Sequence, residues 1–377
     1  MKNDITQNTD IRGLQFLKDT KIDYSYSEKT LDELEKISKP IGKVNMQALE
    51  LFKKEYKKLN KLPFEITPQE KHFLEKNKEE THFGYLVYRY EFKIFPKKKI
   101  DTDFPCYVLI EPVSSCNLKC GMCFQSDNTF IKKEFMGKMD MELYKKIIDE
   151  CCKEGTKAIT FGSRGEPTIH QNFKEFIDYA NNKFMDLKII TNATKLDDEL
   201  IHKIFQSNIS QVVFSIDSEK KQEYEEIRKF GKYDEVLQNV KNYNKIKKEY
   251  KNCKTTTRIS GVKVRDSQDP KSFSSFWSEY ADEVVMKPAY PRWNTYINEK
   301  MDELTKPCEY WWERMYVWFD GKVNPCDADY KSYLSYGNVK ENTIKDIWNS
   351  NKLKNYREQH LSGNRGSITP CDRCGLA

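Results

Sequence analysis

Short apolar runs alternate with amphipathic stretches from about residue 106 to residue 290. The runs have the length and residue types of buried strands, and the stretches between them repeat apolar residues at helical spacing. The expected strands cover residues 106–111, 157–161, 187–191, 212–216, 256–264 and 283–286. The expected helices cover residues 141–152, 173–183, 197–206, 233–250 and 270–280. This alternation implies right-handed crossovers and a parallel sheet. Because six units fall short of the eight of a closed barrel, we expect an α/β fold with a partial (β/α)6 barrel.

The first hundred residues follow a different pattern. Residues 27–59 have helical periodicity, whereas residues 84–95 alternate in the manner of a strand. Neither stretch carries a chemical motif, so the segment has no predicted role. We expect three parts: an N-terminal extension (1–100), the barrel (101–300) and a small C-terminal domain (301–377).

Composition excludes several classes of protein. Apolar residues make up 38% and aromatic residues 13% of 377 residues, which is enough for a folded core. The 64 basic residues are nearly balanced by 58 acidic ones, and the block Lys97–Lys99 is short, so no nucleic-acid partner is expected. The chain has no apolar run of membrane-spanning length and begins without an apolar signal segment. We therefore expect a cytoplasmic protein whose 11 cysteines bind metal and do not form disulfides.

Three cysteines lie close together immediately after the first expected strand. They are Cys116, Cys120 and Cys123, and Phe124 follows them. Three thiolates can ligate three irons of a 4Fe–4S cube, which leaves the fourth iron open to a substrate or cofactor. Zinc sites and ferredoxins use other cysteine spacings. Because ligands of parallel α/β folds sit at the carboxyl ends of the strands, the cluster is expected in the barrel mouth.

This triplet with Phe124 resembles the signature of the radical S-adenosylmethionine (radical SAM) superfamily. After the second strand, Gly165 and Glu166 belong to Gly-Ser-Arg-Gly-Glu-Pro, which is similar to that family's Gly-Gly-Glu-Pro element. The resemblance implies that S-adenosylmethionine binds the open iron and is cleaved by one-electron reduction to a 5'-deoxyadenosyl radical. It also implies that Glu166 holds the cofactor's amino group through charge-assisted hydrogen bonds. Arg164 departs from the family pattern, in which a glycine often stands at this position.

Two further strand ends carry weaker motifs. Thr191 and Asn192 open a sequence that resembles the Thr-Asn-Gly-Thr of the auxiliary-cluster branch, and Ser215 and Asp217 resemble its Ser-Ile-Asp. The resemblance implies that all four residues bind the cofactor, and that Ser215 and Asp217 contact the ribose or the methionyl carboxylate region. The alternative is that these residues simply form turns or cap helices, as Ser and Thr often do at such positions.

A second set of cysteines lies beyond the barrel. An Asp320-Gly321 turn between apolar runs predicts a hairpin, and a helix over residues 344–356 would help to gather the thiols. The arrangement resembles the twitch domain, a truncated SPASM domain, which implies one auxiliary 4Fe–4S cluster and hence two clusters in all. Structural zinc remains an alternative for four thiols. The second set consists of Cys308, Cys326, Cys371 and Cys374, and no role is assigned to Cys106, Cys151, Cys152 and Cys253.

The resemblance implies a radical SAM oxidoreductase that takes a hydrogen atom from its substrate. An auxiliary cluster that accepts a second electron would make the net reaction a two-electron oxidation, and the expected substrate is a small molecule: a sugar, cyclitol or nucleotide-sugar alcohol. A flavodoxin or ferredoxin type donor would supply electrons. If the protein is an enzyme, the alternative is that it modifies a peptide or protein. An iron–sulfur electron-transfer or sensor protein is the non-enzyme alternative, and it would not need Glu166.

Possible substrate contacts lie between the barrel and the C-terminal domain. Arg292 could bind a phosphate or carboxylate, with Tyr290 and Trp293 stacking on a ring, or these residues could only pack the interface. His170 could act as a base, although a lone histidine is more often structural.

Overall fold

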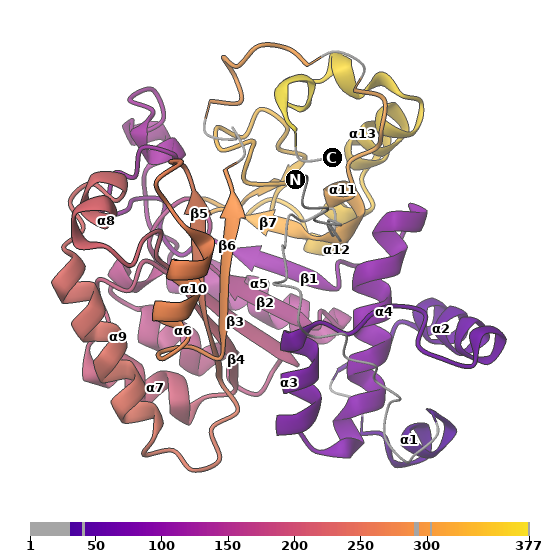
Figure 1. Ribbon diagram of the computed structural model, residues 1–377. Coiled ribbons are helices and arrows are strands. Elements are labelled where there is room, and N and C mark those ends of the chain that lie inside the picture. Colours follow the sequence, from indigo (N-terminus) through magenta and orange to yellow (C-terminus); the bar gives the residue numbers. More distant parts are fainter. Residues whose placement is uncertain (1–30, 40–41, 290–293, 302–303, 376–377) are drawn as a thin grey trace, which may run out of the picture.

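The computed structural model describes residues 31–39, 42–289, 294–301 and 304–375. Six parallel strands curl into the expected partial barrel, and Figure 1 shows helices α6 to α9 along one side of it and α1 to α4 along the other. The six expected strands are confirmed, with ends that differ by up to three residues. The strands are β1 (Tyr107–Ile110), β2 (Ala158–Phe161), β3 (Asp186–Thr191), β4 (Ile209–Ser215), β5 (Thr256–Lys263) and β6 (Glu283–Pro288).

The sheet continues past β1 into the C-terminal segment. The strand order is β6-β5-β4-β3-β2-β1-β7-β8-β9, and β7 (Met315–Val317) runs parallel to β1. Strands β8 (Lys322–Asn324) and β9 (Gly337–Asn338) then pair antiparallel. In this register Val108 of β1 lies between Ile159 of β2 and Met315 of β7. The C-terminal segment is therefore anchored to the barrel by backbone hydrogen bonds.

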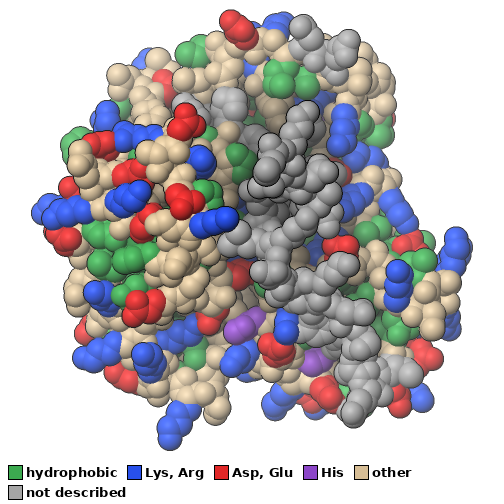
Figure 2. All heavy atoms as spheres, viewed as in Figure 1, with side chains coloured by type: hydrophobic (Ala, Val, Ile, Leu, Met, Phe, Trp, Pro, Cys, Tyr) green, Lys and Arg blue, Asp and Glu red, His purple; other side chains and the backbone are tan. Residues whose placement is uncertain are grey.

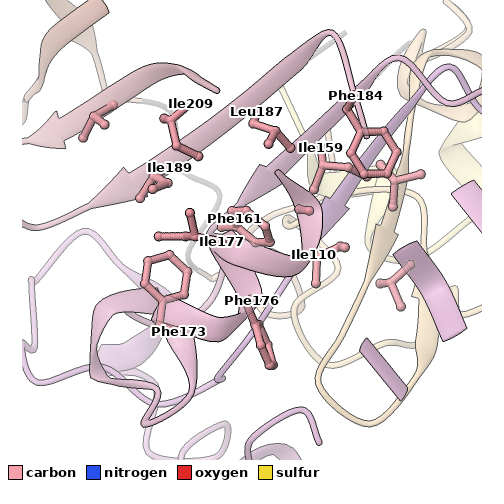
Figure 3. Close-up of a cluster of buried hydrophobic side chains, with 14 of the residues drawn as sticks. Ile110, Ile159, Phe161, Phe173, Phe176, Ile177, Phe184, Leu187, Ile189 and Ile209 are labelled. Atoms are coloured by element: carbon pink, nitrogen blue, oxygen red, sulfur yellow. The ribbon is translucent and has the colours of Figure 1, made fainter. Parts of the chain in front are cut away.

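The barrel helices cover the convex face of the sheet and bury its core. Each has an apolar stripe, and Figure 3 shows Phe173 and Ile177 of α6 next to Phe161 of β2. Burying such a stripe against the sheet is the main stabilising contribution. The helices are α5 (Met141–Glu154), α6 (Phe173–Ala180), α7 (Asp198–Gln206), α8 (Lys221–Ile227), α9 (Tyr233–Lys247) and α10 (Pro270–Trp277).

The strand predicted for residues 84–95 is wrong, because this segment lies within helix α4 (His82–Lys98). Most of its side chains are buried, since α4 packs against α2 and α11. A helix buried on most sides shows no polar face, so its run of alternating aromatic and polar residues imitates a strand. The other N-terminal helices are α1 (Leu31–Ile37), α2 (Met46–Leu59) and α3 (Pro68–Lys76).

The C-terminal segment contains the predicted hairpin. Strands β7 and β8 meet at Gly321, whose φ of 87° is readily adopted only by glycine. The single helix expected over 344–356 is wrong: the chain forms two helices, and the second begins after Ser350, whose side chain accepts a hydrogen bond from the Leu353 N–H. These helices are α11 (Tyr310–Glu313), α12 (Ile344–Trp348) and α13 (Asn351–Leu361).

Charges of both signs are interspersed over the face of the molecule shown in Figure 2, as expected from the balanced composition. No helix among the described residues is long and apolar enough to cross a membrane.

Candidate functional site

The cysteine triplet lies on the loop that follows β1, at the carboxyl end of the sheet. Cys120 is buried, whereas Cys116 and Cys123 are partly exposed. Burial raises the pKa of the Cys116 thiol to about 12, and nearby Glu166, Cys120 and Cys123 add to the rise. The three thiols therefore lie within electrostatic reach of one another and of Glu166.

Glu166 joins the ends of β2 and β3 through a set of hydrogen bonds. Its Oε1 accepts from the hydroxyls of Thr191 (2.6 Å) and Thr168 (2.7 Å), and its Oε2 accepts from the Asn192 N–H (2.7 Å). Burial raises the pKa of the Glu166 carboxyl, and these hydrogen bonds oppose the rise. A carboxylate with this many donors is fixed in place, and each donor favours its charged form over its neutral form.

Asn192 links this carboxylate to the triplet loop. Its Nδ2 donates to Asn117 Oδ1 at 2.9 Å and lies 3.7 Å from Cys116 Sγ, while Asn117 donates in turn to the Thr194 hydroxyl at 2.8 Å. The structure thus brings together Glu166, Asn192 and the first cysteine, which the sequence motifs place on three different strand ends.

The turn after β2 is shaped for close approach to the triplet loop. A Cβ on Gly165 would lie 2.1 Å from the Val113 carbonyl oxygen and 2.4 Å from that of Ser115, so only glycine fits. The neighbouring Ser163 has a φ of 104°, and its buried hydroxyl has no partner in the described part of the chain. Three thiols, an anchored carboxylate and an unpaired hydroxyl on one mouth fit an iron–sulfur cluster with an amine-bearing ligand.

Arg164, which departs from the motif, is an anchor between the barrel and the C-terminal segment. It forms a two-pronged ion pair with Glu111 at the end of β1, with distances of 2.5 and 2.6 Å. Its Nη1 donates to the Tyr330 carbonyl oxygen at 2.8 Å, and its guanidinium lies 4.3 Å from the Trp318 ring centroid. Because both charged groups are buried, the pair stabilises the turn only while both members are present.

The end of the fourth strand carries a buried ion pair. Asp217 is buried, accepts from the Val262 N–H at 2.8 Å and forms an ion pair with Arg228 at 2.8 Å. The positive charge of Arg228 also acts on the Cys120 thiol. Asp217 therefore positions Arg228 beside the triplet loop, and a cofactor contact by Asp217 or by Ser215 stays a prediction.

Arg228 was not predicted from the sequence. It stands at the end of α8 among other charged residues, and no motif distinguishes it. Only its ion pair with the carboxylate of the Ser-Ile-Asp element could have indicated it.

The second set of cysteines also gathers in one place. Burial raises the pKa of the Cys326 thiol well above its ordinary value, and the three other thiols, those of Cys374, Cys371 and Cys308, add to the rise. Four thiols within electrostatic reach of one another are suited to a multi-iron cluster, in which separate thiols bind separate irons. In the described ranges, no group of three or more His, Cys, Asp or Glu side chains converges on the position of one metal ion.

The surroundings of these four cysteines are buried and hydrogen-bonded. His360 lies between the Cys308 N–H (3.2 Å) and the Trp311 indole N–H (2.8 Å). Arg365 is buried and donates to the Cys374 carbonyl oxygen. Loops on either side of the site are thereby tied to α11 and α13.

An aromatic contact connects the two cysteine regions. The Phe124 ring, next to Cys123, stacks on the Tyr330 ring with centroids 5.2 Å apart. The Tyr330 hydroxyl donates to Asp127 Oδ2 at 2.8 Å, and Lys331 forms an ion pair with the same carboxylate. The loop of the triplet and the loop after Cys326 are therefore packed as one unit.

Two sequence hypotheses have different outcomes. Arg292, Tyr290 and Trp293 lie outside the described residues. His170 is buried, and its ring nitrogens face the Met139 carbonyl oxygen and the Asn172 N–H, which supports a structural role.

Two family models match the chain. One is the radical SAM superfamily over residues 110–273, and the other is the SPASM iron-sulfur cluster-binding domain over residues 308–375. Together they imply S-adenosylmethionine and two iron–sulfur clusters, and the description of the second favours a cluster over zinc for the four C-terminal cysteines.

Curated relatives match along most of the chain. A tungsten-containing aldehyde ferredoxin oxidoreductase cofactor-modifying protein of Pyrococcus furiosus is 27% identical over 67% of this chain and 83% of its own. A cysteine-type anaerobic sulfatase-maturating enzyme of Clostridium novyi is 25% identical over 68% of this chain and 82% of its own.

Solved structures share the fold. BtrN in complex with AdoMet and 2-DOIA has a TM-score of 0.52 at 19% identity and covers 73% of this chain and 94% of its own. Streptococcus suis SuiB bound to S-adenosylmethionine has a TM-score of 0.53 at 16% identity and covers 87% of this chain and 81% of its own. The expected α/β architecture with a C-terminal SPASM-type domain is confirmed.

Proposed function

The chain belongs to the radical SAM superfamily and carries a SPASM iron–sulfur domain, and from this we propose that it is an oxidoreductase that abstracts a hydrogen atom from its substrate and completes a two-electron oxidation. When bound at the triplet, reduced cluster and S-adenosylmethionine supply a 5'-deoxyadenosyl radical. The observation that carries the proposal is the hydrogen-bonded Glu166, which joins two strand ends beside the triplet.

The chain's own residues hold and orient the cofactor. Cys116, Cys120 and Cys123 would ligate the first cluster, and the Glu166 carboxylate would accept hydrogen bonds from the ammonium of S-adenosylmethionine. Because Thr191, Asn192 and the glycine turn already fix that carboxylate, little ordering remains for the moment of binding.

The C-terminal domain supports the oxidation. Four thiols for one auxiliary cluster leave no iron open to a substrate, so this centre is suited to accept an electron and not to bind a ligand. The packed contact between Phe124 and Tyr330 holds the two cysteine regions close together. A flavodoxin or ferredoxin type protein would deliver the first electron.

Two substrate classes suit this chemistry. One is a hydroxyl of a sugar, cyclitol or nucleotide-sugar, which oxidation would convert to a ketone. The other is a peptide or protein side chain, and it fits the relatives at least as well, because one of them is a sulfatase-maturating enzyme. The other relative is a cofactor-modifying protein, which keeps small molecules among the candidates.

The test is production of 5'-deoxyadenosine by reduced, reconstituted protein with S-adenosylmethionine. We expect turnover in the unchanged chain and in Cys253→Ala, a matched control outside both sets of cysteines, and none in Cys120→Ala. Equal yields in Cys120→Ala and the unchanged chain would refute the assignment.

A second measurement examines the oxidation. Cys326→Ala should retain production of 5'-deoxyadenosine while losing the iron that the C-terminal site contributes, as counted by iron analysis. A loss of zinc with no change in iron would contradict the auxiliary cluster.

A further inference from the structure

We propose that Lys188 and Arg258 form an anion-binding site inside the barrel, which takes a carboxylate or phosphate group of the substrate next to a hydroxyl or N–H donor. The inference rests on the proposed function, because it places the substrate in the barrel beneath the strand ends. It adds the chemical class of group that the substrate must carry.

Strand alternation places Lys188 inside the barrel. Its neighbours Leu187 and Ile189 are fully buried in the core beneath the helices, so the Lys188 side chain points to the opposite, concave face of β3. In register, Lys188 lies between Thr160 of β2 and Gln211 of β4. The side chain is partly exposed although protein surrounds it, which is expected of a group that projects into the barrel interior.

The Lys188 ammonium has no hydrogen bond or ion pair with any described residue, yet several charges surround it. Burial lowers its pKa to about 8; Asp186 opposes this effect, and Arg258 adds to it. Asp186 accepts from the Ser210 hydroxyl. An anion between Lys188 and Arg258 would offset both the burial and the repulsion of the two cations.

The ion pair of Arg258 uses only one of the three guanidinium nitrogens. Its Nε lies 2.5 Å from Glu283 Oε2, and its two terminal nitrogens have no partner among the described residues. Those nitrogens can donate to a carboxylate or phosphate in the planar, two-pronged manner of arginine. Glu283 thus orients the guanidinium while leaving its outer edge for a ligand.

Gln211 supplies the second feature of the site. It is fully buried, and its Nε2 donates to Glu283 Oε2 at 3.4 Å, which directs its Oε1 away from that carboxylate. That Oε1 has no partner within the described ranges. A buried acceptor without a donor is unfavourable by about 1–3 kcal/mol. A hydroxyl or N–H next to the anionic group of the substrate would satisfy it.

The experiment titrates the reconstituted, unreduced protein with inorganic phosphate, glycolate and acetate, each followed by calorimetry. We expect Lys188→Met to weaken binding of the preferred anion at least tenfold, and Lys174→Met, a surface lysine, to leave it unchanged. A preference for phosphate would indicate a phosphorylated substrate, and a preference for glycolate over acetate would indicate a hydroxy acid. Equal binding by Lys188→Met and the unchanged protein would overturn the proposal.

Lys188→Arg keeps the charge and guards against misfolding of the methionine variant, so it should bind the preferred anion within threefold of the unchanged protein. If it loses binding as completely as Lys188→Met, the positive charge at this position is not the determinant and the proposal fails. Because the titration needs no reduction, it is independent of 5'-deoxyadenosine production, which tests the proposed function separately.

Discussion

A buried carboxylate lies at each end of the barrel, and the two differ in how many hydrogen bonds they receive. At the mouth, Glu166 receives hydrogen bonds from two hydroxyls and two backbone N–H groups. At the other end, where β1 and β2 begin, Glu91 of α4 is equally buried but receives one hydrogen bond among the described residues, from Asn45 at 2.8 Å. Burial raises the pKa of Glu91 to about 7.

The two carboxyls differ in how far hydrogen bonds oppose the effect of burial. Four donors oppose the rise in the pKa of Glu166, whereas the single donor at Glu91 leaves a carboxyl that takes up a proton near neutral pH. Burial alone therefore does not distinguish these two carboxylates, whereas the number of hydrogen-bond donors does.

The largest expected effect comes from removing the cation at the mouth. Arg164→Met would leave the Glu111 carboxylate buried without a counter-charge, and we expect the free energy of unfolding to fall by about 3–5 kcal/mol. Urea denaturation measures the change. Because Arg164 also donates to the Tyr330 carbonyl oxygen, iron bound by the C-terminal cysteines should fall as well.

The control is Glu111→Gln combined with Arg164→Met, which removes both charges. It should recover much of the lost stability, since no uncompensated charge remains. If the double variant is as unstable as Arg164→Met, packing and not charge explains the role of Arg164.

The next effect lies at the opposite end and depends on pH. The folded pKa of Glu91, about 7, is above the value of about 4.3 in an unfolded chain, so the folded protein binds the proton more tightly. The contribution of Glu91 to stability is thus greatest below about pH 4 and falls as pH rises to about 7, by roughly 3 kcal/mol. Glu91→Gln should flatten this dependence and raise the free energy of unfolding at pH 8.

Urea denaturation at pH 5 and pH 8 measures both proteins. Glu50→Gln, at an exposed position on the neighbouring helix α2, serves as the matched control and should change neither value. A Glu91→Gln variant with the same pH dependence as the unchanged protein would contradict the assignment.

The sequence predicts the mouth of the barrel better than the other end, because only the mouth carries short sequence motifs. At the mouth, short motifs such as Gly165-Glu166 follow strands directly, so strand alternation and a parallel sheet place them together. The role of Arg164 could not be predicted, because its partner Glu111 lies 53 residues away in the chain. Arg228 lies closer in the chain to its partner Asp217, but no motif distinguishes it from the charged residues around it.

The other end carries no motif, and there the prediction from pattern was wrong. Helix α4 is buried on most sides by packing with α2 and α11, which removes the polar face that identifies a helix. Lys188 was not predicted as a binding residue for a related reason. The sequence shows only a lysine within an apolar strand, and the folded barrel is needed to show that its side chain faces the interior.

Removing the charge of Glu166 tests whether this carboxylate binds the cofactor. Glu166→Gln keeps the shape, but an amide nitrogen would face either the Asn192 N–H or the Thr191 hydroxyl, and the attraction for an ammonium is lost. We expect S-adenosylmethionine to bind about 10- to 100-fold more weakly, equivalent to about 1.5–3 kcal/mol. Calorimetry of the reconstituted protein measures the affinity, and a change below threefold would argue against a contact with the cofactor.

The smallest effect concerns the contact between the two cysteine regions. Tyr330→Phe keeps the ring that stacks on Phe124 but removes the hydroxyl that donates to Asp127. Since Lys331 still pairs with that carboxylate, the free energy of unfolding should fall by only about 1 kcal/mol. Tyr333→Phe, on an exposed ring, is the matched control and should have no effect in urea denaturation. Suppose that Tyr330→Phe lowers the free energy of unfolding as much as Arg164→Met does. The Tyr330 hydroxyl, and not the buried ion pair, would then be the main contact between the C-terminal domain and the barrel mouth.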